Sequence, residues 1–129
     1  MIFDLSTLEL PGRISADLCV IGSGPGGATV AMTAAEAGLK VIVIEAGGFI
    51  SPVDMTQREE EMLPRLLWRA GSRTTTNYAV HIHQGKGVGG SSLHNLNLCK
   101  RIPDEILEEW VATRGLRYLP PTKWDALYT

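Results

Sequence analysis

The sequence has few cysteines, little net charge and no long hydrophobic run, and each scarcity excludes a class of protein. Its two cysteines among 129 residues form no C-x-x-C pair, so neither a disulfide framework nor a zinc site is expected. The formal net charge of −2 argues against a nucleic-acid-binding surface. No apolar run approaches the ~18 residues of a membrane span, and residues 1–4 do not resemble a signal peptide. We therefore expect one small domain in a reducing, cytoplasmic setting, without a membrane span or a bound metal.

The stretch that organises the chain, residues 17–45, has the pattern of strand, glycine turn, helix and strand. An apolar run at residues 18–21 leads into Gly22-Ser23-Gly24-Pro25-Gly26-Gly27, and alanines at helical spacing continue to Gly38. A second apolar run, residues 41–44, ends at Glu45. Continuous apolar runs are typical of parallel strands buried on both faces. This pattern predicts an α/β fold with a Rossmann-like βαβ unit.

The glycine turn has the G-x-G-x-x-G spacing of dinucleotide-binding proteins. Gly22 would permit the tight turn, Gly24 would let a pyrophosphate approach the backbone, and Gly27 would let the helix pack against the sheet. Pro25 suits the first helical turn, and the positive end of the helix dipole favours an anion. Glu45 follows about 20 residues later, the separation that places an acid on ribose hydroxyls. The motif does not choose between FAD and NAD, although Glu45 disfavours a 2′-phosphate.

The middle of the chain predicts a kinked helix followed by a strand. Asp54 could cap a helix through residues 55–63, which Pro64 should kink or restart before Gly71 ends it. Residues 77–83 alternate in the manner of a half-exposed strand, with two histidines on one face. No further ligand completes a metal set around them, so no metal site is predicted.

Residues 85–95 form a second glycine-rich segment, Gly85-Lys86-Gly87-Val88-Gly89-Gly90-Ser91-Ser92-Leu93-His94-Asn95. Such a loop exposes backbone N–H groups, which can hold a phosphate or lie flat against a planar ring. A further helix is expected over residues 104–113, with Ile106, Leu107 and Trp110 on its buried side.

These two glycine-rich segments, in this order and at this separation, resemble the glucose-methanol-choline (GMC) oxidoreductases, which are flavoproteins that oxidise alcohols. The first motif includes the sequence that ends at Glu45-Ala46-Gly47-Gly48; the second, followed by Pro103, is the more specific and favours FAD over NAD. The resemblance extends from Asp17 to Trp110. It implies that residues 22–27 hold the FAD pyrophosphate and Glu45 the adenosine ribose. Residues 85–92 would run along the flavin and its ribityl-phosphate arm, with Asn95 near the ring.

The resemblance thus gives a complete set of expected cofactor-binding residues. They are Gly22, Ser23, Gly24, Pro25, Gly26, Gly27, Glu45, Ala46, Gly85, Lys86, Gly87, Val88, Gly89, Gly90, Ser91, Ser92, His94 and Asn95. Many family members have an apolar residue at the position of His94. In choline-oxidase-like members a histidine there is bonded covalently to the flavin, so His94 is a candidate for covalent attachment.

The resemblance also implies that much of the enzyme is missing from residues 1–129. Family members are far longer, and their substrate domain and catalytic histidine lie near the C-terminus, so no catalytic residue is assigned here. We expect residues 1–129 to be a partial FAD-binding domain, inactive alone, of an enzyme that passes hydride from an alcohol CH–OH group to flavin N5. Two alternatives remain open: an NAD-dependent dehydrogenase, and a truncated, non-catalytic nucleotide-binding module.

Overall fold

The computed structural model describes residues 2–4, 13–96, 98, 100–116, 124, 125 and 128. The chain forms two compact units, Met1–Leu96 and Asn97–Thr129. Pro11-Gly12, a pair that predicts a turn before the first strand, lies outside the described residues. Asn97, Cys99 and most of the stretch after Leu116 also lie outside them. The expectation of one domain over residues 1–129 stays a prediction.

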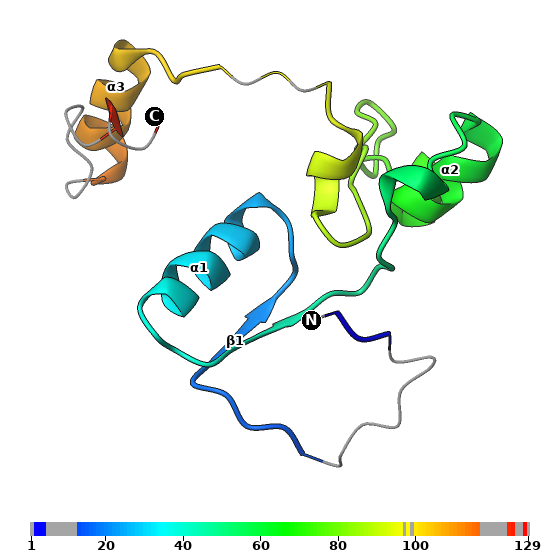
Figure 1. The fold of residues 1–129 in the computed structure, drawn as a ribbon. Coiled ribbons are helices and arrows are strands. Elements are labelled where there is room, and N and C mark those ends of the chain that lie inside the picture. Colours follow the sequence, from blue (N-terminus) through cyan, green and yellow to red (C-terminus); the bar gives the residue numbers. More distant parts are fainter. Residues whose placement is uncertain are drawn as a thin grey trace. The chain divides into compact units, whose positions relative to one another are not determined.

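The first unit opens with a strand, a helix and a parallel strand. Strand β1 (Leu18–Ile21) pairs with β2 (Val41–Ile44), with Leu18 opposite Val41 and Ile21 opposite Ile44. Helix α1 (Pro25–Glu36) connects them and lies alongside β1 (Figure 1). Gly38, with φ +86°, ends the helical stretch because this backbone conformation suits glycine. The predicted α/β arrangement with parallel strands is confirmed.

The prediction that both strands are buried on both faces is wrong for this chain. Val20 is buried, but Ile21 is 86% exposed and Ile44 is 53% exposed. Among the described residues the sheet has only two strands, and α1 is the helix that packs on them. The rest of the sheet surface therefore has no described segment to cover it.

The segment after β2 folds differently from the predicted kinked helix. Asp54 does not cap a long helix; it closes a capping box with Ser51 around the short 3-10 helix η1 (Pro52–Asp54). Helix α2 (Glu59–Leu66) begins five residues later and continues through Pro64. Pro64 has no N–H to donate to the carbonyl four residues earlier, and its ring crowds that carbonyl. Here the carbonyl belongs to Glu60, an exposed residue in the first turn of α2. The 3-10 helix η2 (Trp68–Gly71) follows.

A small hydrophobic core lies beneath the second glycine-rich segment. It consists of Ile50, Met62, Leu66 and Leu67, and Leu93 packs against it. Leu93 belongs to the 3-10 helix η3 (Gly90–His94), which ends the glycine-rich loop. The core therefore supports that loop from one side.

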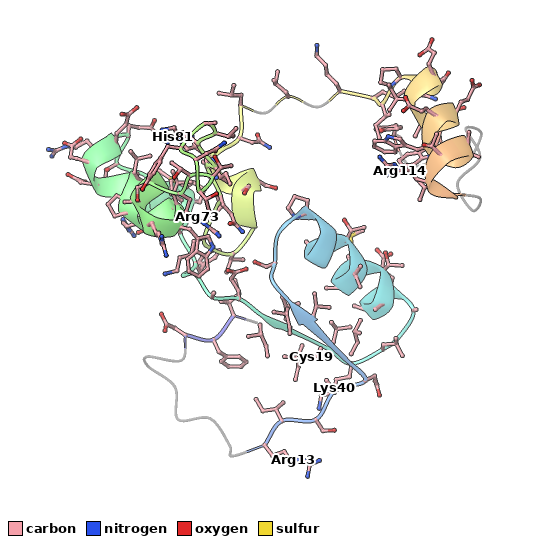
Figure 2. All side chains as sticks on the ribbon, turned by 180° about the vertical axis from the view of Figure 1, so that it is seen from behind. Arg13, Cys19, Lys40, Arg73, His81 and Arg114 are labelled. Atoms are coloured by element: carbon pink, nitrogen blue, oxygen red, sulfur yellow. The ribbon has the colours of Figure 1, made fainter. Side chains whose placement is uncertain are left out.

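The strand predicted over residues 77–83 is absent, and a turn takes its place. The N–H of Tyr78 donates to the carbonyl of Thr75, and the N–H of Thr75 donates to the carbonyl of Val80. Tyr78 has φ +59°, which breaks the alternation of faces that a strand requires. Figure 2 shows His81 and Arg73 on this loop, beside α2. Within the described part of the chain, no three histidine, cysteine or acidic side chains are grouped to hold a metal ion.

The second unit contains helix α3 (Asp104–Arg114), one residue longer than the predicted helix. Leu107 is 2% exposed, as expected, but Ile106 and Trp110 are 39% and 38% exposed. Of the three residues predicted on the buried side of the helix, only Leu107 is therefore buried. Gly115, with φ +68°, ends the helix. None of the described helices combines the length and the hydrophobicity that a membrane crossing requires.

Candidate functional site

Three segments meet where the two parallel strands end: residues 22–27, residues 45–48 and residues 85–90. The N–H of Gly22 donates to the carbonyl of Ile44 at 2.7 Å, which joins the ends of β1 and β2. The N–H of Val88 donates to the carbonyl of Gly48 at 3.1 Å, which joins the third segment to the second. The carboxyl ends of parallel strands are where α/β proteins bind ligands.

The first glycine segment makes the tight turn that its spacing predicts. Gly22 has φ +91°, a conformation that favours glycine. A Cβ on Gly27 would overlap the carbonyl oxygen of Gly22 and lie 3.2 Å from a methyl of Val20. Only glycine therefore lets α1 approach β1 so closely, and the packing role predicted for Gly27 is confirmed.

Gly24 stands at the N-terminus of α1 and leaves open space in front of it. It is the N-cap residue, with φ −64° and ψ 179°, and among the described residues no side chain caps the helix there. A Cβ on Gly24 would meet nothing closer than the Cα of Gly90, at 3.9 Å. Protein packing therefore does not require glycine at this position. The free space and the positive helix end suit an anion.

Glu45 lies at the end of β2 with its carboxylate turned toward the glycine turn. Its Oε2 accepts the Ser23 N–H at 2.9 Å and the Ser23 hydroxyl at 2.8 Å, and its Oε1 accepts the Gly47 N–H at 2.9 Å. Partial burial acts to raise the pKa of Glu45, but these hydrogen bonds together outweigh it and lower the pKa below its ordinary value. The carboxylate is therefore ionised at neutral pH.

The second glycine segment is fixed on both sides by backbone hydrogen bonds. The N–H of Lys86 donates to the carbonyl of Leu66 at 2.7 Å, and Leu67 and Gly85 form an antiparallel bridge. The Ser91 hydroxyl oxygen accepts the N–H of Gly85 at 2.9 Å, which closes the loop on itself. Because of these hydrogen bonds, the segment is an ordered loop with a defined conformation and not a flexible linker.

The Lys86 side chain of this loop contacts Trp68. Its Nζ stands 4.9 Å from the centre of the Trp68 ring, a cation–π contact. A hollow of about 330 Å³ opens nearby, lined in part by Lys86, Arg65, Phe49 and Ala46. Residues 46–48, which directly follow Glu45, line this hollow, so the turn at residues 45–48 has free space beside it.

Gly47 belongs to the first motif but was not among the residues expected to bind the cofactor. A Cβ on Gly47 would lie 2.6 Å from the Cα of Gly87 and would collide with that backbone. Gly90, with φ +58°, approaches the first segment as closely, because its Cβ would lie 2.8 Å from the Cα of Gly24. The signal in the sequence was the glycine pair that follows Glu45 and Ala46, but the contact of Gly47 is with Gly87, 40 positions further along the sequence.

Three of the predicted residues, Ser92, His94 and Asn95, lie in the last part of η3 or directly after it. His94 has a buried Nε2 atom without a hydrogen-bond partner among the described residues. Buried polar atoms are nearly always paired, so this one calls for an explanation. Ser92 and Asn95 are exposed, and Asn95 directly follows η3 as its C-cap residue.

The residues present fit a dinucleotide with a pyrophosphate. The end of α1 offers an uncapped helix terminus with room before Gly24, and ionised Glu45 offers acceptors for ribose hydroxyls. The hollow of about 330 Å³ beside residues 46–48 is at the lower end of ligand-pocket size. An α/β unit with such a glycine-lined end is characteristic of nucleotide-binding proteins.

Comparisons with known protein families give the more specific class. Residues 17–51 match the FAD binding domain, and residues 63–128 match the GMC oxidoreductase family. The chain therefore belongs to the GMC oxidoreductase family, as its two glycine-rich segments indicated, and FAD is its cofactor.

Curated relatives cover most of this chain. It is 37% identical over 114 residues to the long-chain-alcohol oxidase FAO4B of Arabidopsis thaliana, which covers 88% of this chain and 15% of the relative. It is 32% identical over 118 residues to the uncharacterized GMC-type oxidoreductase y4nJ of Sinorhizobium fredii, covering 90% of this chain and 23% of the relative. Patulin synthase of Penicillium expansum is 30% identical, over 85% of this chain and 20% of the relative. The chain thus spans less than a quarter of the length of these relatives.

Proposed function

We propose that this chain is the FAD-binding part of a flavin-dependent oxidoreductase that oxidises the CH–OH group of an alcohol. The observation that carries the proposal is the meeting of residues 22–27, 45–48 and 85–90 around the open end of α1. Membership in the GMC family supports the same reaction class. A bound flavin supplies the hydride acceptor, while this chain supplies the binding surface.

We assign the binding roles by position within a Rossmann-like βαβ unit. Residues 22–27 would bind the pyrophosphate through backbone N–H groups, and Glu45, followed by Ala46, would bind the adenosine ribose. Residues 85–92 would lie along the flavin and its ribityl-phosphate arm, with Asn95 beside the ring. These roles are supported by the open space before Gly24 and by the fixed backbone of the second loop.

His94 is proposed to contact the flavin directly and to carry it covalently. The support is its buried Nε2, which has no hydrogen-bond partner in the described part of the protein. Acid precipitation of the flavin-loaded protein tests this. Flavin should remain in the pellet of the wild type and of His83→Ala, an exposed histidine of the neighbouring loop, and should leave with the supernatant for His94→Ala. Flavin in the wild-type supernatant would refute the covalent bond.

An alcohol is the proposed substrate, and a long aliphatic alcohol is the first to test. Three further relatives, FAO1, FAO3 and FAO4A of Arabidopsis thaliana, are also named long-chain-alcohol oxidases. The experiment adds such an alcohol, without oxygen, to the whole protein loaded with FAD. Loss of the flavin's visible absorbance would support the reaction class. An unchanged spectrum across a series of alcohols would refute it.

A cytoplasmic location stays a prediction from the cysteine content.

A further inference from the structure

Ser23 touches both of the other segments that form the site. Its hydroxyl oxygen lies 2.8 Å from Oε2 of Glu45 and 3.4 Å from the carbonyl oxygen of Gly87. The same oxygen accepts the N–H of Gly89 at 3.0 Å. One small side chain thus connects the proposed ribose site at Glu45 with the loop proposed to hold the flavin.

The hydroxyl has one proton and two acceptors within reach. A serine hydroxyl can donate one hydrogen bond and accept two. The shorter distance, 2.8 Å against 3.4 Å, assigns its proton to Glu45 in this structure. The carbonyl of Gly87 is the alternative acceptor, and the Gly89 N–H can donate to the hydroxyl in either orientation.

The carboxylate of Glu45 has little capacity left for a ligand. Each carboxylate oxygen accepts about two hydrogen bonds, and Oε2 already accepts two, both from Ser23. The Gly47 N–H occupies one position on Oε1, and the Ala46 N–H also interacts with the carboxylate. These N–H groups are fixed in the backbone. The Ser23 hydroxyl, in contrast, can turn away by a simple rotation.

We propose that Ser23 is a positioning residue that couples ribose binding at Glu45 to the order of the loop at residues 85–90. A ribose hydroxyl that donates to Oε2 takes the place of the Ser23 proton, which then turns to the carbonyl of Gly87. Ser23 would then bind the loop at two points, Gly87 and Gly89, instead of one. The inference rests on the proposed function, because it requires a ribose at Glu45.

Hydrogen exchange in the presence of two nucleotides tests this coupling. The probes are ADP and 2′,3′-dideoxy-ADP, which lacks the ribose hydroxyls, each at a concentration that saturates the protein. In the wild type, ADP should slow amide exchange in residues 85–90 more than the dideoxy analogue does. The difference should be about two- to tenfold, the effect of one additional hydrogen bond.

Two variants make the test specific to Ser23. In Ser23→Ala, the two nucleotides should protect residues 85–90 equally, because the connecting hydroxyl is gone. Thr29→Val also deletes a hydroxyl near the glycine turn, one that donates to the carbonyl of Pro25 within the same helix. That variant should keep the wild-type difference. A merely structural role of Ser23 would not depend on the ribose hydroxyls.

The outcomes separate this inference from the proposed function. If neither nucleotide protects residues 22–27, no nucleotide binds there and the proposed function is wrong. If both protect residues 22–27 but affect residues 85–90 equally in the wild type, the site stands and the coupling is refuted. A Ser23→Ala variant that keeps the difference would also refute it. If that variant does not fold, equal protection of residues 85–90 by the two nucleotides in the wild type would still refute the coupling.

Discussion

Gly24→Ala should separate what the fold requires from what the ligand requires. The added Cβ would lie 3.9 Å from the Cα of Gly90, an ordinary contact, and the backbone angles of −64° and 179° are open to alanine. Alanine is a poorer N-cap than glycine, which costs several tenths of a kcal/mol or more. The reduced freedom of the unfolded chain offsets this by about 0.4–1 kcal/mol. The free energy of unfolding should therefore change by less than about 1 kcal/mol.

FAD binding, in contrast, should suffer. If the pyrophosphate lies against Gly24, a methyl group there must displace the phosphate or the loop. Overpacking of this kind costs about 1–3 kcal/mol, which corresponds to a loss of about 5- to 150-fold in affinity. Thermal unfolding without ligand gives the stability, and titration of flavin fluorescence gives the affinity. Thr29→Val is the control, because it changes a side chain of the same helix α1 outside the three segments that form the site.

Two results would refute the reasoning about Gly24. Unchanged FAD affinity would mean that no phosphate approaches this glycine. Loss of folding in the absence of FAD would mean that the protein itself needs the space. Only a Gly24→Ala variant that folds stably and binds FAD more weakly agrees with a glycine that the ligand requires and the fold does not.

Further predictions concern stability and charge. Gly47→Ala should lower the free energy of unfolding by about 1–3 kcal/mol in denaturant titrations, whereas Gly48→Ala should not, because only the first Cβ meets the backbone of the second loop. Leu66→Ala should cost about 2–5 kcal/mol and Leu63→Ala much less, since the first is 8% exposed and the second 38%; equal melting shifts would contradict the assigned core. The stability contributed by Glu45 should be complete above the ordinary glutamate pKa of about 4.3 and lost as the pH falls through its lower folded value. The Glu45→Gln variant should lack this loss of stability in the acid range. If the stability difference between the wild type and Glu45→Gln changed between pH 5 and 8 instead, the prediction would be contradicted.

Local backbone chemistry made the βαβ unit predictable from sequence. The tight turn at Gly22, the close packing at Gly27 and the helix end at Gly38 each require a glycine for reasons that act within a few residues or between consecutive elements. The apolar runs on either side determined strand type and direction. Burial could not be predicted in the same way, because Ile21 depends on neighbours outside the two strands.

Contacts between distant segments could not be read from the sequence. The hydroxyl of Ser23 meets residues 64 and 66 positions away, and no local pattern signals such a partner. The strand predicted over residues 77–83 was wrong because alternating side chains are also compatible with a turn. The positive φ of Tyr78 shows which of the two the chain adopts. The second glycine-rich segment was visible in the sequence, but only the resemblance to the GMC family gave it a specific role along the flavin.

The most direct measurement is a calorimetric titration of the purified protein with FAD and, separately, with NAD. We expect FAD to bind at one site per chain, and Gly24→Ala to weaken it while Thr29→Val does not. We expect no heat of binding with NAD. A protein that binds NAD as tightly as FAD, or that is folded and binds neither, would contradict the assignment of residues 22–27, 45–48 and 85–90 to an FAD site.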